Sequence, residues 1–239
     1  MNRGGDYWKA GLDEVPDEVW RRTDLEVLIL ADNRLTALPP DIGRLRRLRT
    51  LDLGHNRLVR VPEEIGGLAE LSGCLYLHDN DLAELPESIG GLTRLGYLNI
   101  GENRLVKLPA SLGRLAALTE LRAQHNALAE LPESLGGLVA LRELWLRGNR
   151  LTGLPRSLAG LRELRLVELR DNALGAVPEA LRGLPLLRRI DLRGNPLHEV
   201  PAWVAELPSL EKLDLRWTPV DEDQRPLRAL RERGCVVLV

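Results

Sequence analysis

The sequence predicts an α/β fold, a curved solenoid with about ten short parallel strands on its concave face and short helical or 3-10 segments on its convex face. The first observation behind this prediction is an asparagine that recurs every 23 residues, apart from one interval of 24, always with a leucine two positions later. The second is the spacing of leucines within each period, which changes from strand-like to helix-like. The asparagines are Asn33, Asn56, Asn80, Asn103, Asn126, Asn149, Asn172 and Asn195.

One period, residues 48–66 (LRTLDLGHNRLVRVPEEIG), shows how each unit is built. Leu51 and Leu53 are two residues apart, which is the spacing of one face of a strand. The apolar residues that follow change to helical spacing. Pro62 fits the first turn of a short helix, and Gly66 is expected to end it in the left-handed conformation. Since one unit cannot bury its leucines alone, neighbouring units must stack and share one leucine interior.

The repeated asparagine lies where the chain leaves each strand. Its side chain can donate hydrogen bonds to backbone groups of adjacent turns and accept others from them. Such bonds satisfy polar groups that would otherwise be buried without partners. We therefore interpret all eight asparagines as structural.

The pattern LxxLxLxxNxLxxLPxxIGxL is that of the leucine-rich repeat, and it covers nearly the whole chain. The 23-residue unit with its LP and IG pairs resembles the subclass found in Ras-suppressor proteins, plant intracellular Ras-group repeat proteins and Scribble-type scaffolds. This resemblance implies a frame for binding other proteins. It also implies a small GTPase or its regulator as one class of partner. Repeats of this kind serve many unrelated partners, so the resemblance does not name one.

The unbroken period predicts a single leucine-rich repeat domain over residues 1–239. Residues 1–24 are expected to form a capping turn, because an alanine stands where the asparagine should be. Residues 25–217 hold the regular repeats, and residues 218–239 are expected to form a closing helix and strand. End units of a solenoid must hide an otherwise open interior.

Both ends carry specific expectations. Trp8 and Trp20 are expected to cover the leucine core at the start of the coil. Residues 221–233 predict a polar helix, followed by a glycine that stops it. Adding one period to the last regular strand places Val236 and Leu238 facing inward on a final parallel strand.

Two departures from the period carry further expectations. One residue too many lies around 72–74, which indicates either a tolerated insertion or a bulge that re-aims nearby side chains. In the last third, Ala159, Arg182 and Ala205 replace the glycine that follows each short helix. Better helix formers at that point predict more helical outer segments.

Composition narrows the classes of function. The net charge is −2, which favours neither nucleic acid nor a membrane surface as a partner. No apolar run is long enough for a membrane span, and the start lacks the apolar core of a secretory signal, so we expect a cytoplasmic protein. Cys74 and Cys235 lie in distant units and are expected to be free thiols.

Residues one period apart should lie side by side on the concave face, where function is expected. The central column runs through Ile29, Asp52, Tyr76, Asn99, Arg122, Trp145, Glu168, Asp191 and Asp214. The column two residues further on ends in four arginines, Arg147, Arg170, Arg193 and Arg216. These arginines are either a solvated charge ladder with neighbouring acids or a set of donors for carboxylates or phosphates of a partner.

Aromatic residues are rare in this chain, at 3%, so those on the concave face stand out. Tyr76, Tyr97 and Trp145 are predicted to be anchors for a protein partner, next to Arg122 in the same region. Trp217 follows the last regular strand, and we expect the closing strand to cover it.

Signs of chemistry are few. The sequence has neither a phosphate-binding glycine loop nor the metal-ligand spacings CxxC or HExxH, and it implies no cofactor. His55, Cys74 and His78 could meet from neighbouring strands, which leaves an enzyme with a metal or thiol site near Cys74 and His78 as one alternative.

The leading prediction is therefore a non-catalytic adaptor or scaffold that binds a protein on its concave face. A second alternative is a bacterial effector delivered into a host cell, where it binds a host signalling protein. A third is a purely structural repeat element that packs through Trp203 on the convex side. The identity of the partner and the oligomeric state are left open by the sequence.

Overall fold

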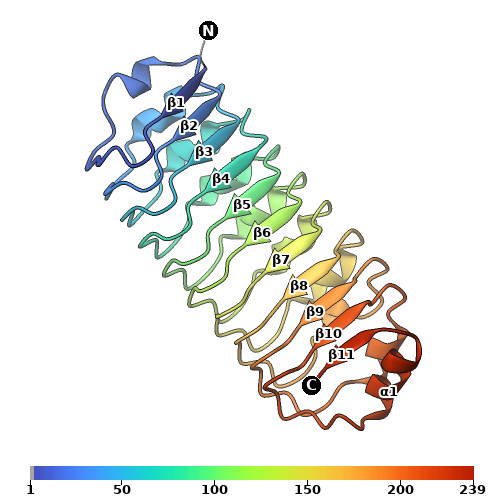
Figure 1. The fold of residues 1–239 in the computed structure, drawn as a ribbon. Coiled ribbons are helices and arrows are strands. Elements are labelled where there is room, and N and C mark those ends of the chain that lie inside the picture. Colours follow the sequence, from blue (N-terminus) through green and yellow to red (C-terminus); the bar gives the residue numbers. More distant parts are fainter. Residues whose placement is uncertain (1–2) are drawn as a thin grey trace.

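The computed structural model describes residues 3–239, and within them eleven short strands form one open parallel sheet in chain order (Figure 1). Side chains on one face of this sheet pack into the core, and those on the other form the concave face. The predicted parallel solenoid is thus confirmed. The strands are β1 Gly4–Asp6, β2 Val27–Ile29, β3 Thr50–Asp52, β4 Cys74–Tyr76, β5 Tyr97–Asn99, β6 Glu120–Arg122, β7 Glu143–Trp145, β8 Leu166–Glu168, β9 Arg189–Asp191, β10 Lys212–Asp214 and β11 Val236–Leu238.

Short 3-10 helices form the opposite layer of each turn, and one α-helix, α1 (Arg225–Glu232), follows near the C-terminus. Most begin after a proline in the extended conformation, such as Pro155. The last third is not more helical, contrary to expectation, because segments of at most five residues are too short to nucleate an α-helix. The 3-10 helices are η1 Val19–Arg21, η2 Pro40–Arg44, η3 Glu63–Gly67, η4 Glu87–Gly91, η5 Ala110–Arg114, η6 Glu133–Gly137, η7 Arg156–Gly160, η8 Glu179–Leu181 and η9 Ala202–Glu206.

The repeated convex glycine serves close packing instead of a left-handed turn. Gly66 lies inside η3 and is absent from the glycines with positive φ in the described residues. A Cβ atom placed on it would lie 2.2 Å from the carbonyl oxygen of Ser88 in the next turn. Gly113 has the same relation to Ser134, at 2.0 Å. Glycine at this position therefore lets neighbouring 3-10 helices approach closely.

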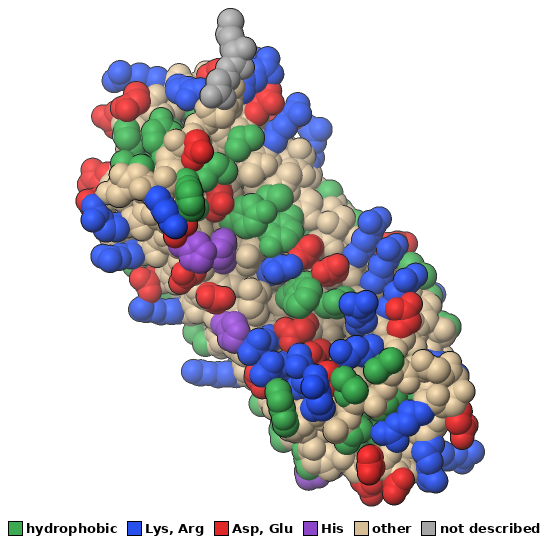
Figure 2. Space-filling model, viewed as in Figure 1, with side chains coloured by type: hydrophobic (Ala, Val, Ile, Leu, Met, Phe, Trp, Pro, Cys, Tyr) green, Lys and Arg blue, Asp and Glu red, His purple; other side chains and the backbone are tan. Residues whose placement is uncertain are grey.

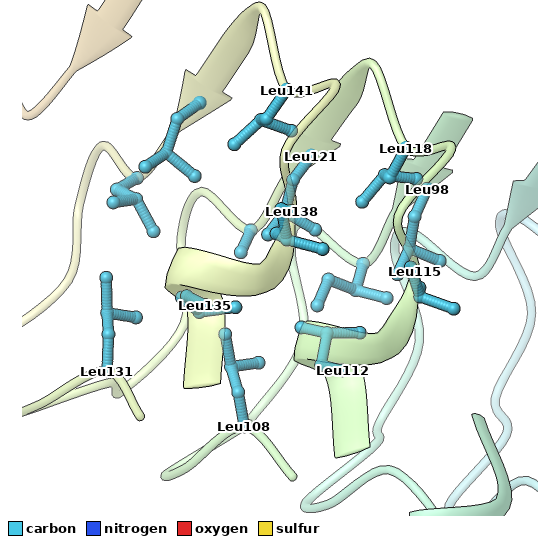
Figure 3. Close-up of a cluster of buried hydrophobic side chains, with 14 of the residues drawn as sticks. Leu98, Leu108, Leu112, Leu115, Leu118, Leu121, Leu131, Leu135, Leu138 and Leu141 are labelled. Carbon is cyan, nitrogen blue, oxygen red and sulfur yellow. The ribbon is translucent and has the colours of Figure 1, made fainter. Parts of the chain in front are cut away.

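Leucines from the strands and from the 3-10 helices meet in one continuous core (Figure 3). In the turns shown there, Leu98 and Leu121 come from strands, whereas Leu112 and Leu135 come from the 3-10 helices, and all four are fully buried. Burying one leucine side chain contributes roughly 1.5–3 kcal/mol. The shared interior is therefore the main source of stability in every turn.

The repeated asparagines make the predicted ladder of hydrogen bonds. The Asn172 amide nitrogen Nδ2 donates to three carbonyl oxygens, those of Leu146 at 3.0 Å, Leu169 at 3.0 Å and Arg170 at 3.3 Å. Its Oδ1 accepts from the backbone N–H of Leu151 at 3.0 Å. The seven others accept the equivalent backbone N–H of the preceding turn. Their structural role is thus confirmed.

The extra residue disturbs the start of β4, which distinguishes between the two alternatives that the sequence left open. The β3 and β4 strands pair only through Leu51 with Leu75 and through Asp52 with Tyr76, whereas most neighbouring strands have three pairs. The Gly73 N–H still reaches the Arg49 carbonyl oxygen at 2.8 Å. The structure therefore favours a local bulge next to this glycine.

The expectations for the N-terminal end are half correct. Trp20 is buried against the leucine core. Trp8 is 56% exposed and does not cover the core. Its indole Nε1 donates to the Asp32 carboxylate at 2.6 Å, which places it beside the next turn.

At the other end, α1 buries Leu227 and Leu230, and β11 closes the sheet on β10. The prediction that Val236 and Leu238 face inward is wrong. Leu213 pairs with Val237, an interval of 24 residues, and Val236 is 52% exposed. The helix and the turn at Gly234, with φ of 87°, take up one residue more than a regular unit. A slip of one residue moves every side chain of a strand to the other face.

Trp203 lies inside η9 and is only 5% exposed. Its indole Nε1 donates to the Glu179 carboxylate at 2.8 Å. A lateral contact through Trp203 is therefore not supported, because the side chain is occupied within the coil. In the part of the chain that the structure describes, no helix is both long and apolar enough to cross a bilayer.

Candidate functional site on the concave face

The strand register places the predicted concave columns side by side. Arg122 pairs with Trp145, Trp145 with Glu168, and Glu168 with Asp191, each on neighbouring strands. The row continues to Asp214. Figure 2 shows this face of the sheet, with hydrophobic side chains near its middle and mixed basic and acidic side chains toward the C-terminal half.

The predicted aromatic anchors form one continuous stack with Arg122. The rings of Tyr76 and Tyr97 lie 5.1 Å apart, and the Arg122 guanidinium lies 5.9 Å from the Tyr97 ring and 4.9 Å from the Trp145 ring. Such arrangements of guanidinium and aromatic faces are mutually attractive. A hydrogen bond with the Cys74 side chain, followed by burial, raises the pKa of Tyr76. The tyrosine hydroxyls therefore stay protonated and can donate hydrogen bonds to a partner.

The four predicted arginines also lie in a row, which we call the arginine row (Arg147, Arg170, Arg193 and Arg216). Their turns are linked by backbone hydrogen bonds, in which the N–H groups of residues 148, 171 and 194 donate to the carbonyl oxygens of Arg170, Arg193 and Arg216 at 2.9, 2.8 and 3.1 Å. The predicted column two residues beyond the central one is thus also present in the structure.

Acids within the chain already engage the arginine row. Arg193 Nη2 lies 2.5 Å from Asp191, and Arg216 Nη2 lies 2.8 Å from Asp214. Asp171 lies 3.0 Å from Arg170 Nε and 3.5 Å from Arg147 Nε. Burial acts to raise the pKa of Asp214, but hydrogen bonds from Arg216 outweigh it and lower the pKa. The row is therefore partly neutralised, most strongly at its C-terminal end.

The expectation that the closing strand covers Trp217 is wrong, because this side chain is 65% exposed. β11 pairs with β10 only over Lys212–Asp214 and ends before reaching it. The guanidinium carbons of Arg170, Arg193 and Arg216 lie 4.9, 5.8 and 5.8 Å from its ring. Trp217 therefore belongs to the exposed end of the arginine row.

The backbone at Trp217 is left-handed, with φ of 63°. The position directly after the arginine row has positive φ in the other turns as well, where it holds small or polar residues such as Asp171 and Gly194. A bulky aromatic residue is uncommon there and costs roughly 1–2 kcal/mol. Sequence reasoning missed this column, although its run of Asp, His and Gly residues was a usable signal.

A hollow of about 310 Å³ lies over β7 to β10. Trp145 and Leu166 form part of its wall, and Glu168, Asp191 and Asp214 line it. Glu168 is only 8% exposed, and burial followed by repulsion from Asp191 raises its pKa to about 7. The sequence placed Glu168 among the acids beside the arginines, but it did not predict that this side chain is buried.

His55, Cys74 and His78 are the residues that the sequence suggests for a metal or thiol site. His55 Nδ1 lies 2.6 Å from Asp79, and the Nε2 atoms of His55 and His78 lie 3.2 Å apart. Cys74 begins β4 and His78 lies two residues beyond its end, so the two are about 13 Å apart along an extended chain. Among residues 3–239, no three His, Cys, Asp or Glu side chains gather so as to hold a metal ion. Within the described residues, His55, Cys74 and His78 therefore do not form a three-ligand metal site.

Comparisons with known proteins agree with the fold. A family model described as leucine-rich repeat region matches residues 74–168, and one described as leucine rich repeat matches residues 23–82. Among curated proteins, none matches the chain.

Several solved structures are similar. A leucine-rich repeat protein of Leptospira interrogans is 29% identical, with a TM-score of 0.72, over 94% of this chain and 69% of that one. The ectodomain of the receptor kinase GASSHO1/SCHENGEN3 from Arabidopsis thaliana is 29% identical with a TM-score of 0.79, over 91% of this chain and 27% of that ectodomain chain. The effector YopM of Yersinia pestis is 28% identical with a TM-score of 0.65, over 87% of this chain and 53% of the effector.

This chain thus spans well under two thirds of the receptor and the effector that it resembles. The matched repeats, the parallel sheet and the asparagine ladder agree on one architecture. The chain is a leucine-rich repeat protein.

Proposed function

We propose that this protein is a non-catalytic adaptor or scaffold that binds a protein partner on its concave face. The observation that carries the proposal is the unbroken surface formed by the stack of Tyr76, Tyr97, Arg122 and Trp145 and, beyond it, the arginine row. Aromatic and arginine side chains are enriched among the residues that dominate protein interfaces. Leucine-rich repeats in general serve as protein-binding modules, which supports the same conclusion.

Known structures support a protein or peptide as the partner. The GASSHO1/SCHENGEN3 ectodomain was solved in complex with CASPARIAN STRIP INTEGRITY FACTOR 2, and the plant peptide hormone receptor RGFR1 in complex with RGF2. We propose that carboxylates of the partner approach the arginine row, where the side chains of Arg147 and Arg216 are 38% and 41% exposed. Trp217 then offers an apolar contact beside these charges.

The likeness to YopM favours a second candidate, a bacterial effector that binds a host signalling protein. In either case we propose a cytoplasmic site of action. The 23-residue unit favours membership of the Ras-suppressor and Scribble-type subclass, and hence a small GTPase or its regulator as partner. The effector role and the small GTPase or regulator as partner both require binding on the same concave face.

Reversing charge in the arginine row tests the proposal. Proteins from the source cell are captured on the wild-type protein, on Arg170→Glu/Arg193→Glu and on a control, Arg46→Glu/Arg162→Glu, which changes two exposed arginines outside this face. We expect a partner that is retained by the wild type and by the control and is lost with the first variant. Identical capture by all three proteins, with unchanged melting temperatures, would show that the row is only a solvated charge ladder.

A further inference from the structure

The hollow over β7 to β10 contains one side chain whose hydrogen bonding is incomplete. Glu168 is 8% exposed, and its Oε1 is buried without a hydrogen-bond partner among the described residues. A buried carboxylate oxygen without a donor costs free energy that a bound donor would restore. Glu168 lines the hollow, so a group that enters there can supply this donor.

The other carboxylates of the hollow are already paired. Arg193 donates to Asp191 through Nε at 2.9 Å and through Nη2 at 2.5 Å. Arg216 donates to Asp214 through Nε at 2.9 Å and Nη2 at 2.8 Å. After these pairs are formed, Glu168 is the acid of the hollow that retains an unused acceptor.

One part of the wall next to Glu168 is apolar, whereas Arg147, Arg189, Arg193 and Lys212 also line the hollow. Trp145 lies on the neighbouring strand, directly beside Glu168 in the register, and Leu166 lies two residues before Glu168 on the same strand. The Arg122 guanidinium already stacks 4.9 Å from the Trp145 ring. An aliphatic stem could therefore lie along Trp145 and Leu166 while its charged head reaches the carboxylate.

We propose that this hollow is a binding site for one cationic side chain, a guanidinium or an ammonium group, that donates to Glu168 Oε1. The chemistry follows from three features of the site, which are the unpartnered Glu168 Oε1, the apolar stretch of wall at Trp145 and Leu166, and a volume of about 310 Å³. Among the basic side chains that line the hollow, Arg193 and Lys212 already lie next to Asp191 or Asp214. The proposal rests on the proposed function only in that the partner protein supplies this side chain. A partner would thus insert one basic residue here and present carboxylates to the arginine row.

Free amino-acid derivatives test the site without any partner. N-acetyl-arginine amide and N-acetyl-lysine amide are titrated into the ¹⁵N-labelled full chain, and the indole N–H signal of Trp145, assigned with Trp145→Phe, is followed. N-acetyl-norleucine amide provides the stem without the charge, and N-acetyl-glutamate amide provides the opposite charge. The variant Glu168→Gln keeps the shape of the side chain, and Glu130→Gln, at an exposed position elsewhere, is its control.

We expect saturable shifts with at least one cationic probe, with Kd on the order of millimolar for so small a ligand. Glu168→Gln should weaken that binding by about tenfold or more, because hydrogen bonds to charged groups are the strong ones, and Glu130→Gln should leave it unchanged. Equal shifts with norleucine amide, binding of the glutamate amide alone, or binding insensitive to Glu168→Gln would each overturn the proposal. Failure of this titration leaves the capture result with the arginine row unaffected, so the two proposals are tested separately.

Discussion

Removing the charge of Glu168 should change how stability depends on pH. In the folded protein its pKa is raised from 4.5 to about 7, first by burial and then by Asp191. Between these two values the folded state holds a proton that the unfolded state has lost, so the free energy of unfolding falls as the pH rises through this window. Below pH 4.5 both states are protonated and this contribution is fully present.

The magnitude follows from the size of the shift. A rise from 4.5 to about 7 corresponds to about 3 kcal/mol lost above pH 7, and some access of water to the hollow reduces it, so we expect about 1–3 kcal/mol. Arg147 and Arg193 face the same carboxylate and act in the opposite direction. Glu168→Gln cannot ionise, so it should be more stable than the wild type at pH 8 by this amount and should lose the advantage near pH 5.

Urea unfolding of both proteins between pH 5 and pH 8 measures the effect. The difference between the two proteins is the relevant quantity, because burial followed by His55 lowers the pKa of His78, which makes the wild type lose stability on acidification. That second contribution is common to both proteins and cancels. If the difference between them stayed constant across this range, the burial of an ionisable Glu168 would be refuted.

Three further predictions concern packing, the ladder and the exposed tryptophan. Gly66→Ala should destabilise the fold by about 1–3 kcal/mol, because its Cβ meets the next turn at 2.2 Å. The control Gly67→Ala has open space around it and should be neutral or slightly stabilising. Equal denaturation midpoints for the two variants would contradict this prediction. Asn172→Ala should cost about 3 kcal/mol in urea unfolding, since two buried carbonyls, one part-buried carbonyl and one N–H lose a partner. A loss below about 0.5 kcal/mol would refute the ladder's role. Trp217→Gly should change the free energy of unfolding by less than about 1 kcal/mol, because relief of the left-handed φ of 63° offsets the lost stacking on the arginines. The same variant should weaken binding of a captured partner. Unchanged binding in a pull-down would show that Trp217 is not part of the binding site.

Much of the concave face follows from the period alone. Because each unit has nearly constant length, the strands pair in register, and residues one period apart become neighbours. The stack of Tyr97, Arg122 and Trp145 could thus be placed from the sequence, and the ring distances agree with that placement. The asparagine ladder was predictable for the same reason, since a polar residue at every strand exit must satisfy backbone groups.

Features that depend on backbone conformation at single positions were not predictable from the period. Trp217 has a left-handed φ of 63° and is 65% exposed, because β11 pairs with β10 only up to Asp214 and does not reach it. The turn at Gly234 shifts β11 by one residue and reverses which of its side chains face inward. Gly66 shows the same limit, because its role depends on the distance to the next turn and leaves no trace in local propensity.

The charged side chains of the concave face show why a count of residue types does not identify the groups that are free to bind a partner. Arg193 and Arg216 direct their donors at Asp191 and Asp214, so a partner's carboxylate must compete with acids of the chain itself. Arg147, at 3.5 Å from its nearest acid, is less committed and is the better first contact. Glu168 is the converse case, an acid between arginines whose Oε1 accepts no hydrogen bond from the described residues. The groups free to bind are therefore set by side-chain geometry, and they include one acid within an apparently basic region.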